Sequence, residues 1–443
     1  MTLLAKPGIL LLLLASLCKA HAEDFTAHWE KIWTDFHHHY SYFELKGINW
    51  TNTLEQKRPL FADTTATDFA RNLSDILQTL KDWHVTVQQG GTTRGYQGTF
   101  QQNAPPRLIA PYAMNRSYAN LHNANIIFHA RLTNNAAHIV VTTLDNTLWN
   151  VITDDDLTSI MATHQDASGI ILDLRYNTGG NELNARRLAG HFALEPLTYG
   201  FTRTRIPASI PYAFTPTQAK QLQPVRTGKF TGAVIGLVGQ RTMSSGEAFA
   251  LMVKSLPNGL LLGDRTRGAS ANPVLKTLPE LDLQYTISTW IALDEQGKPF
   301  EGTGIEPAIS IPPEKSFTST RDFVLEEAMA LINWPEKFNL LQYPLKRHTD
   351  LDQDRFADLS EYVAGTDPTL PSSRLVLEWS FQEAQLRLRW KSEFGRRYSI
   401  YEADGLASPL KIAATNILAT PPENSFVPVL NTKSGLYLLT VEK

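Results

Sequence analysis

The sequence contains a single cysteine, Cys18, which lies in an apolar run near the amino terminus. Once that run is removed, as expected below, the chain has no thiol. This excludes disulfide bonds and a catalytic cysteine from the product. A basic excess is missing as well, since the formal net charge is −3 over 443 residues. Nothing in this balance favours nucleic acid or an anionic membrane surface as a partner.

Long apolar runs are also scarce. Only the start, MTLLAKPGILLLLLASLCKAHAEDF, combines a lysine, an apolar run from Ile9 to Leu17 and an Ala-His-Ala sequence before two acids. This order is typical of a secretory signal peptide, and we expect residues 1–22 to be removed by cleavage after Ala22. A membrane-spanning helix needs about 20 apolar residues, so no stretch predicts a transmembrane anchor. The sequence therefore predicts an exported product, either periplasmic or extracellular.

The remaining chain divides into four parts by its pattern. Apolar residues recur at spacings of three and four in 23–105, which predicts a helical amino-terminal subdomain. Short apolar runs alternate with helical segments in 106–342, which indicates an α/β core around a buried, largely parallel sheet. An acid-rich linker follows at 343–371. Alternation with period 2 in 372–443 predicts a small all-β domain.

Individual elements of the core can also be predicted from these patterns. Strands are expected at 125–130, 138–142, 169–174, 233–238 and 259–263, helices at 154–163 and near 321–331, and a loop at 90–107. Three consecutive histidines, His37–His39, have the residue type of a metal site. They cannot all face one ion from a regular helix, so we expect a solvated helix end instead.

Two adjacent serines precede a predicted helix in VIGLVGQRTMSSGEAFALMV, residues 234–253. Ser244 with Glu247 three positions later fits an ordinary capping box, which is a purely structural interpretation. A serine at a helix N-terminus also gains from the helix dipole and from unpaired N–H donors. Both stabilise the charge that forms when its oxygen attacks a carbonyl carbon. Ser244 is therefore a candidate nucleophile.

Three further stretches supply groups that such a serine would need. In GIILDLRYNTGG, Gly179 and Gly180 follow a buried strand, where paired glycines can point backbone N–H groups at a negative oxygen. An ordinary strand-to-helix turn is the alternative. LKDWHVTV contains His84 and PFEGTGIEP contains Glu301, and a base and its orienting acid can come from any part of a chain. A lone histidine beside an apolar stretch, such as His84, is more often structural.

Taken together, DLRYNTGG, SSGEAF, GDRTRGAS and EGTGIEP resemble the C-terminal processing peptidases, or tail-specific proteases, over about residues 24–313. The closer resemblance is to the branch that includes the core of tricorn protease. It implies a crotonase and Clp-protease type of α/β core and a serine peptidase that hydrolyses polypeptides. It also implies Ser244 as nucleophile, with an oxyanion hole formed by the N–H of Ser245 and by Gly179 or Gly180.

The resemblance also bears on the base. Many members carry a lysine in a Thr-x-Gly-Lys stretch, but here Ala269 stands at the lysine position. The tricorn-like branch uses a histidine, which implies His84 as general base and Glu301 as the acid that orients it. No cofactor is expected for catalysis. A peptide-binding PDZ segment, common in the wider family, has no counterpart between residues 89 and 120.

A separate pattern lies in the linker, where acids occupy alternating positions of a twelve-residue loop of the EF-hand kind. The expected calcium ligands are Asp350, Asp352, Asp354, the carbonyl of Phe356, Asp358 and Glu361. Arg355 stands where glycine normally makes the sharp turn. The residues that follow resemble the calcium-binding segments of dockerin and thrombospondin type 3 repeats, and a solvated acidic linker is the alternative. Calcium would stiffen the junction with the β domain.

Two other functions remain open on the sequence. One is a catalytically silent ligand-binding protein on the same fold, and the other is an esterase-type serine hydrolase. Cleavage specificity and oligomeric state have no signal in the sequence.

Overall fold

The computed structural model describes residues 23–105, 118–209, 212–338, 340, 349–382, 385–428 and 435–442. The predicted signal peptide with Cys18, and the predicted boundary near residue 343, lie outside these residues. Among the described residues no helix is long and apolar enough to cross a membrane. The chain forms two compact units. Unit 1 contains 1–98, 203–216 and 271–291, and unit 2 contains 99–202, 217–270 and 292–443.

Unit 1 begins with the predicted helical segment. Its helices are α1 (Thr26–His39), α2 (Thr53–Lys57), the 3-10 turn Arg58–Phe61 and α3 (Ala66–Gln78). The apolar residues at helical spacing in α1 are buried, and Trp29 stacks on Phe61. Thr65 caps α3 by accepting a hydrogen bond from the Asp68 N–H. Local spacing and capping therefore explain why this segment is helical.

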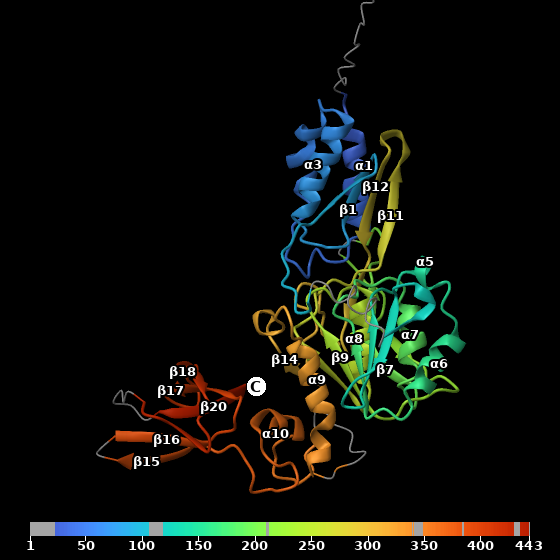
Figure 1. Ribbon diagram of the computed structural model, residues 1–443. Coiled ribbons are helices and arrows are strands. Elements are labelled where there is room, and N and C mark those ends of the chain that lie inside the picture. Colours follow the sequence, from blue (N-terminus) through green and yellow to red (C-terminus); the bar gives the residue numbers. More distant parts are fainter. Residues whose placement is uncertain are drawn as a thin grey trace, which may run out of the picture. The chain divides into compact units, whose positions relative to one another are not determined.

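A four-stranded antiparallel sheet completes unit 1. It has the order β11-β12-β1-β2, with strands β1 (Thr86–Gln89), β2 (Thr92–Gly95), β11 (Pro273–Leu278) and β12 (Leu283–Ser288). Figure 1 shows the yellow β11 and β12 beside the blue β1. The expected loop at 90–107 is thus wrong for Thr92–Gly95, because β2 pairs in register with β1 as a short hairpin.

Unit 2 is built on a seven-stranded sheet of order β14-β10-β9-β6-β5-β4-β3. Its strands are β3 (Ala119–Asn120), β4 (Ile127–Arg131), β5 (Ala137–Val141), β6 (Gly169–Asp173), β9 (Ala233–Val238), β10 (Gly259–Gly263) and β14 (Ile309–Ser310). The five strands from β14 to β5 are parallel, and β4 and β3 are antiparallel. The mixed α/β class predicted from the sequence is confirmed.

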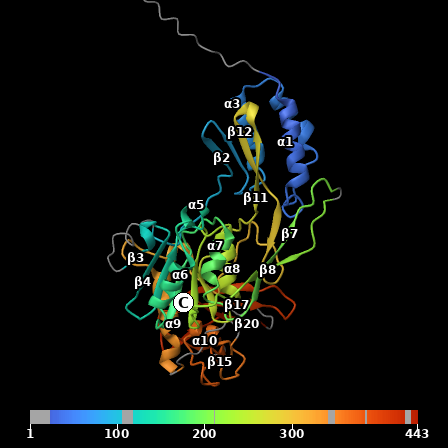
Figure 2. The same ribbon diagram turned by 90° about the vertical axis from the view of Figure 1, so that its right-hand side faces the viewer.

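The two faces of this sheet are covered by different helices. The covering helices are α5 (Asn146–Trp149), α6 (Asp154–Thr163), α7 (Glu182–Ala189), α8 (Ser245–Ser255), α9 (Phe323–Asn333) and α10 (Asp358–Ala364). Ile170 and Leu172 of β6 pack in the same apolar cluster as residues of α6, α7 and α8, which are labelled in Figure 2. Ile171, between them, packs with residues of α9 and α10. Because side chains alternate along each strand, the sheet is buried on both faces, between two layers of helices.

Arg175 locks the carboxyl end of β6 to the start of α9. Its guanidinium donates to both oxygens of Asp173, at 3.0 and 2.7 Å, and to both oxygens of Asp322, at 2.9 and 2.7 Å. Burial alone would raise the pKa of Asp173, but Arg175 and His138 hold it far below its usual range. Asp322 also caps α9. The aspartate and arginine of the Asp-Leu-Arg motif therefore serve a structural role.

Smaller sheets complete the described structure. A three-stranded sheet of order β13-β7-β8 contains β7 (Leu197–Thr204), β8 (Gln218–Leu222) and β13 (Trp290–Leu293). The carboxyl-terminal region has two antiparallel sheets, β15-β16-β19 and β18-β17-β20. Their strands are β15 (Glu378–Gln382), β16 (Gln385–Lys391), β17 (Arg397–Ala403), β18 (Lys411–Leu418), β19 (Glu423–Phe426) and β20 (Leu436–Glu442). The period-2 alternation after residue 371 thus corresponds to β strands.

Candidate active site

Ser244 has a strained backbone immediately before α8. Its backbone φ of 55° and ψ of −127° lie in a region that residues other than glycine rarely adopt. Such a conformation costs about 1–3 kcal/mol and persists only where surrounding contacts hold it. Here the Ser244 N–H donates to the Ala269 carbonyl at 2.7 Å, and its own carbonyl accepts from the first turn of α8. The turn leaves the Ser244 side chain partly exposed.

The buried side chain of Glu247 stabilises this turn. It is fully buried, and its carboxylate accepts from Thr266 Oγ1 at 2.6 Å and from the N–H groups of Gly268 at 2.6 Å and Ala269 at 2.8 Å. A fourth donor is the Ser244 N–H at 3.2 Å. Burial raises the pKa of Glu247 to about 7, against the lowering effect of these donors. Glu247 therefore ties the start of α8 to residues 266–269.

The glycine pair after β6 lies against Ser244. A Cβ added to Gly179 would come within 2.7 Å of the Ser244 Cβ and 3.0 Å of the Ser245 nitrogen. A Cβ on Gly180 would overlap the backbone of Leu144 at 2.2 Å. Both glycines have positive φ, 95° and 134°. The structure thus brings together two motifs that are 64 residues apart in the sequence, and only glycine fits at either position.

The backbone donors at this point are of two kinds. The Gly179 N–H already donates to the Asn177 Oδ1 at 2.9 Å. Within the described residues, the N–H groups of Gly180 and Ser245 make no hydrogen bond. The Ser245 hydroxyl donates to the Gly180 carbonyl at 2.7 Å, which fixes the two peptides relative to each other. N–H groups without an acceptor beside a nucleophile are what a developing oxyanion requires.

Glu301 lies in the loop after Phe300, in contact with the same segment that holds Ser244. Its Oε2 accepts from the Ser270 N–H at 3.3 Å, and the Gly302 N–H donates to the Gly268 carbonyl at 2.7 Å. Ala269 and Ser270 are consecutive, so one short stretch of backbone contacts both Ser244 and Glu301. The side chain of Glu301 is half-buried.

His84 belongs to unit 1, where β12 holds its backbone. The His84 N–H donates to Asp82 Oδ1 at 2.8 Å, and its carbonyl accepts from Thr286 Oγ1 at 2.6 Å. Asp82 Oδ2 in turn accepts from Ser288 Oγ at 2.7 Å. Burial lowers the pKa of His84, and its Nδ1 is buried without a hydrogen-bond partner. Asp82 therefore orients the chain at His84 through the backbone.

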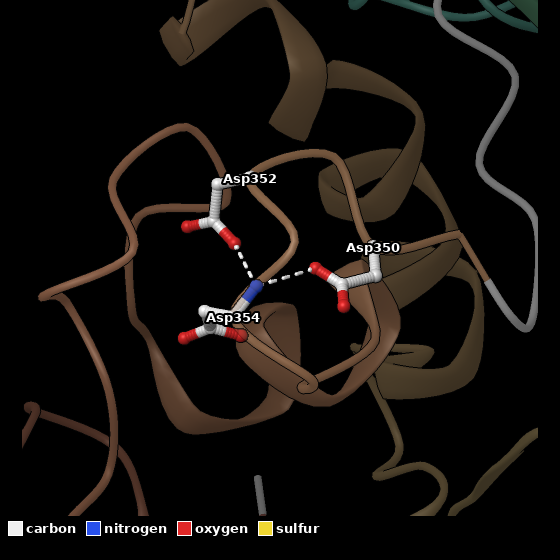
Figure 3. A group of neighbouring side chains, drawn as sticks. All are labelled: Asp350, Asp352 and Asp354. Carbon is white, nitrogen blue, oxygen red and sulfur yellow. Dashed lines mark hydrogen bonds between the residues drawn. The ribbon is translucent and has the colours of Figure 1, made fainter.

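The acidic loop brings three of its predicted ligands together. Oxygen atoms of Asp350, Asp352 and Asp354 lie within 4.8 Å of one another, as Figure 3 shows. Among the described residues this is the only such cluster of acids, histidines and cysteines. The three histidines at the end of α1, His37–His39, are therefore not part of such a group.

Sequence reasoning missed two contributors to the site. Glu247 was expected only as a capping partner, whereas it binds four donors from two segments. Asn177 holds Gly179 through its Oδ1 and the Val141 carbonyl through its Nδ2. The sequence contained a sign of this role for Glu247. Two of its donors, Thr266 and Gly268, lie in the stretch that matches the family's Thr-x-Gly-Lys. For Asn177, the motif DLRYNTGG alone did not indicate which groups its side chain contacts.

Comparisons with known proteins agree with the fold. Residues 135–311 match the family model described as peptidase family S41. The structure resembles a "putative peptidase" from Parabacteroides merdae ATCC 43184, with a TM-score of 0.60 and 21% identity over 69% of this chain and 95% of that one. It also resembles mature CPAF, with a TM-score of 0.53 and 10% identity over 71% of this chain and 98% of that one. Mature CPAF complexed with lactacystin gives a TM-score of 0.50 and 11% identity over 71% and 97%.

The match to this family model indicates a serine peptidase. This match agrees with the resemblance of the sequence motifs to the C-terminal processing peptidases. Ser244, Ser245, Gly179, Gly180 and Glu301 lie within the matched residues, and His84 lies outside them.

Proposed function

We propose that the protein is an exported serine peptidase that cleaves polypeptides through an acyl-enzyme on Ser244. The observation that carries this proposal is the strained turn at Ser244, beside two N–H groups that make no hydrogen bond in the described structure. Strain of this kind collects at functional sites, because an ordinary helix start has no need of it. Export rests on the signal-peptide pattern of residues 1–22.

In the proposed reaction, Ser244 Oγ attacks the carbonyl carbon of the peptide while His84 takes the serine proton. The N–H groups of Gly180 and Ser245 hold the oxyanion of the tetrahedral intermediate. His84 then returns the proton to the leaving amine, and the acyl-enzyme forms. Water, activated by His84, attacks the ester and releases the acid. Glu301 would accept from the imidazole and hold its tautomer.

Two observations favour a histidine base over a lysine base. Ala269 is buried at the position where many relatives carry lysine, and its N–H is used by Glu247. His84 has a pKa lowered by burial, so its imidazole is neutral at pH 7 and can accept a proton. Its buried Nδ1 also makes no hydrogen bond in the described structure, which is compatible with an acid partner such as Glu301. No metal is required for this chemistry.

Labelling by an active-site fluorophosphonate tests the proposal. We expect the wild type to be labelled, Ser244→Ala to lose the label, and Ser255→Ala to keep it. Ser255 is the matched control, since it ends the same helix and its hydroxyl has no hydrogen-bond partner in the part of the chain that the structure describes. CPAF was solved with lactacystin, which makes this compound a second probe.

The outcomes separate the alternatives. Equal labelling of wild type and Ser244→Ala would overturn the assignment of the nucleophile. A well-folded wild type that no probe labels would instead be a ligand-binding protein. Labelling with turnover of simple esters but not of peptides would point to an esterase.

A further inference from the structure

The loop from Asp350 to Glu361 curls its backbone around a point between carboxylates. The Asp354 N–H donates to Asp350 Oδ1 and to Asp352 Oδ1, both at 3.1 Å (Figure 3). The Arg355 N–H donates to Asp350 Oδ2 at 2.8 Å. These bonds hold the acids in place although their charges repel one another. Local hydrogen bonds within an acidic cluster do not by themselves define a ligand site.

Three buried carboxylate oxygens of this loop have no hydrogen-bond partner among the described residues: Asp352 Oδ2, Asp354 Oδ2 and Glu361 Oε2. Glu361 is only 2% exposed and Asp354 8%. The Glu361 carboxylate lies close enough to Asp352, Asp354 and Asp358 to interact with their charges. Buried charges normally have a counter-charge, because desolvation without one costs several kcal/mol.

Among the residues that the structure describes, the cluster has only a weak counter-charge. Arg374 Nε lies 3.8 Å from Asp354 Oδ2, and the Arg374 side chain is 45% exposed. Among the described residues, no ion pair to Asp352 or Glu361 is present. An exposed arginine at this distance neutralises one carboxylate in part, and within the described residues no cation compensates the others.

The backbone of the loop has the shape that a cation loop requires. Arg355 has a φ of 78°, so it makes the left-handed turn at the position where glycine is usual. The carbonyl of Phe356 accepts no hydrogen bond from the described residues and is available as a ligand. Asp358 Oδ1 accepts from the Leu351 N–H at 2.9 Å. Asp358 therefore closes the loop on itself and leaves the first coordination positions to the other acids.

We propose that this loop binds one calcium ion through Asp350, Asp352, Asp354, the Phe356 carbonyl and both oxygens of Glu361. These groups supply about six oxygens, which suits Ca²⁺, whereas Mg²⁺ needs tighter octahedral geometry and usually keeps several waters. The bound charge would satisfy all three oxygens that now make no hydrogen bond.

The ion would act on helix α10, which begins inside the loop. Tyr362 of α10 donates to Glu327 of α9 at 2.7 Å, and its carbonyl accepts from Arg396 Nη2 at 2.8 Å. Leu359 and Tyr362 are buried in the apolar cluster that contains Trp334. α10 thus contacts both the helix that covers the main sheet and the carboxyl-terminal strands, and calcium would make this junction rigid.

Calorimetric titration of the chelator-stripped full-length mature protein with CaCl₂ tests the site. We expect one ion to bind with a Kd of about 10⁻³ M or tighter, and the melting temperature to rise with calcium. Glu361→Gln should raise the Kd by about 10–100-fold. Asp404→Asn is the matched control, because Asp404 is an exposed acid of the β domain paired with Lys411. It should bind calcium as the wild type does.

Absence of both binding heat and thermal stabilisation in the stripped wild type would overturn the proposal. Unchanged binding by Glu361→Gln would place the ion elsewhere and would overturn it as well. Arg374→Gln distinguishes a metal from an internal counter-charge. It should keep or strengthen calcium binding, whereas a cluster neutralised by Arg374 would lose stability in this variant regardless of calcium.

Discussion

Glu247 and Glu361 are both buried, and burial raises the pKa of each to about 7, yet their surroundings are opposite. Both oxygens of Glu247 receive donors from the chain. Glu361 receives one side-chain donor, Thr366, and faces three other acids. A raised pKa therefore does not tell what a buried acid is for. The hydrogen-bond partners do, since both oxygens of Glu247 have donors from the chain, whereas Glu361 would be satisfied by the proposed cation.

Glu247 has a structural role in this description, but its pKa of about 7 also makes it a candidate general base. His84→Ala tests this. We expect kcat/KM for peptides to fall by about 10⁴-fold, because the proposed base is lost. In the wild type, kcat/KM should fall only as pH drops below about 6.5, since burial lowers the pKa of His84 from there. If His84→Ala kept most of its activity and its kcat/KM changed with pH near 7, the general base would be Glu247 instead.

Asp173 shows a third way to satisfy a buried acid, by an ion pair with Arg175. Arg175→Met should lower the free energy of unfolding by about 3–5 kcal/mol, because it leaves Asp173 buried without its counter-charge and frees Asp322. Chemical denaturation measures this directly. A loss below about 1 kcal/mol would mean that the neighbouring His138 compensates Asp173 alone.

Glu247→Gln tests how much the four hydrogen bonds to this buried acid contribute at the active site. The amide replaces one carboxylate oxygen by a donor, so two of the four N–H or O–H groups lose their acceptor. We expect a loss of about 1–3 kcal/mol in stability at pH 7 and a marked loss of activity.

The same variant gives a pH test with a definite sign. Because the pKa of Glu247 rises from 4.5 to about 7 on folding, its contribution is fully present below about pH 4.5 and is lost as pH rises to 7. The stability of the wild type relative to Glu247→Gln should therefore decrease by about 3 kcal/mol over this range. An advantage that grows with pH would show that the four donors outweigh burial.

Thr366→Val has the smallest expected effect. It removes the one side-chain donor to Glu361, at 3.1 Å, and should cost about 0.5–1.5 kcal/mol in the presence of calcium. Thermal unfolding with and without calcium measures it. A cost as large as that of Glu247→Gln would mean that Glu361 depends on its chain partners after all.

Patterns that depend on local sequence predicted much of this structure. The strand at 233–238 and the helix at 154–163 occur with the expected limits, because glycine boundaries, β-branched residues and the Thr153–Asp156 capping box are all local signals. Ser244 and Gly179 could also be placed together, since the carboxyl ends of parallel strands lie at one edge of a sheet.

Long-range pairing was beyond such patterns. Val274 and Leu275 of β11 are exposed, so the strand carries little alternation, and β12 pairs with a strand about 200 residues earlier. The partners of Glu247 could not be predicted either, because three of the four are backbone N–H groups, which any residue type can supply. Arg355 is a different case. Its sequence position lacks glycine, yet the left-handed turn forms, since surrounding bonds offset the modest cost of that conformation.

The placement of β12 has a consequence for how the protein is made. β1 has β2 on one side, made within a few residues, and β12 on the other, with Thr86 and Thr286 in contact. The amino-terminal unit is therefore begun early in synthesis and cannot be finished until residue 288 has emerged. Until then one edge of β1 is open to pairing with other chains. A chain truncated before β12 should aggregate through this edge, although its helices are already complete.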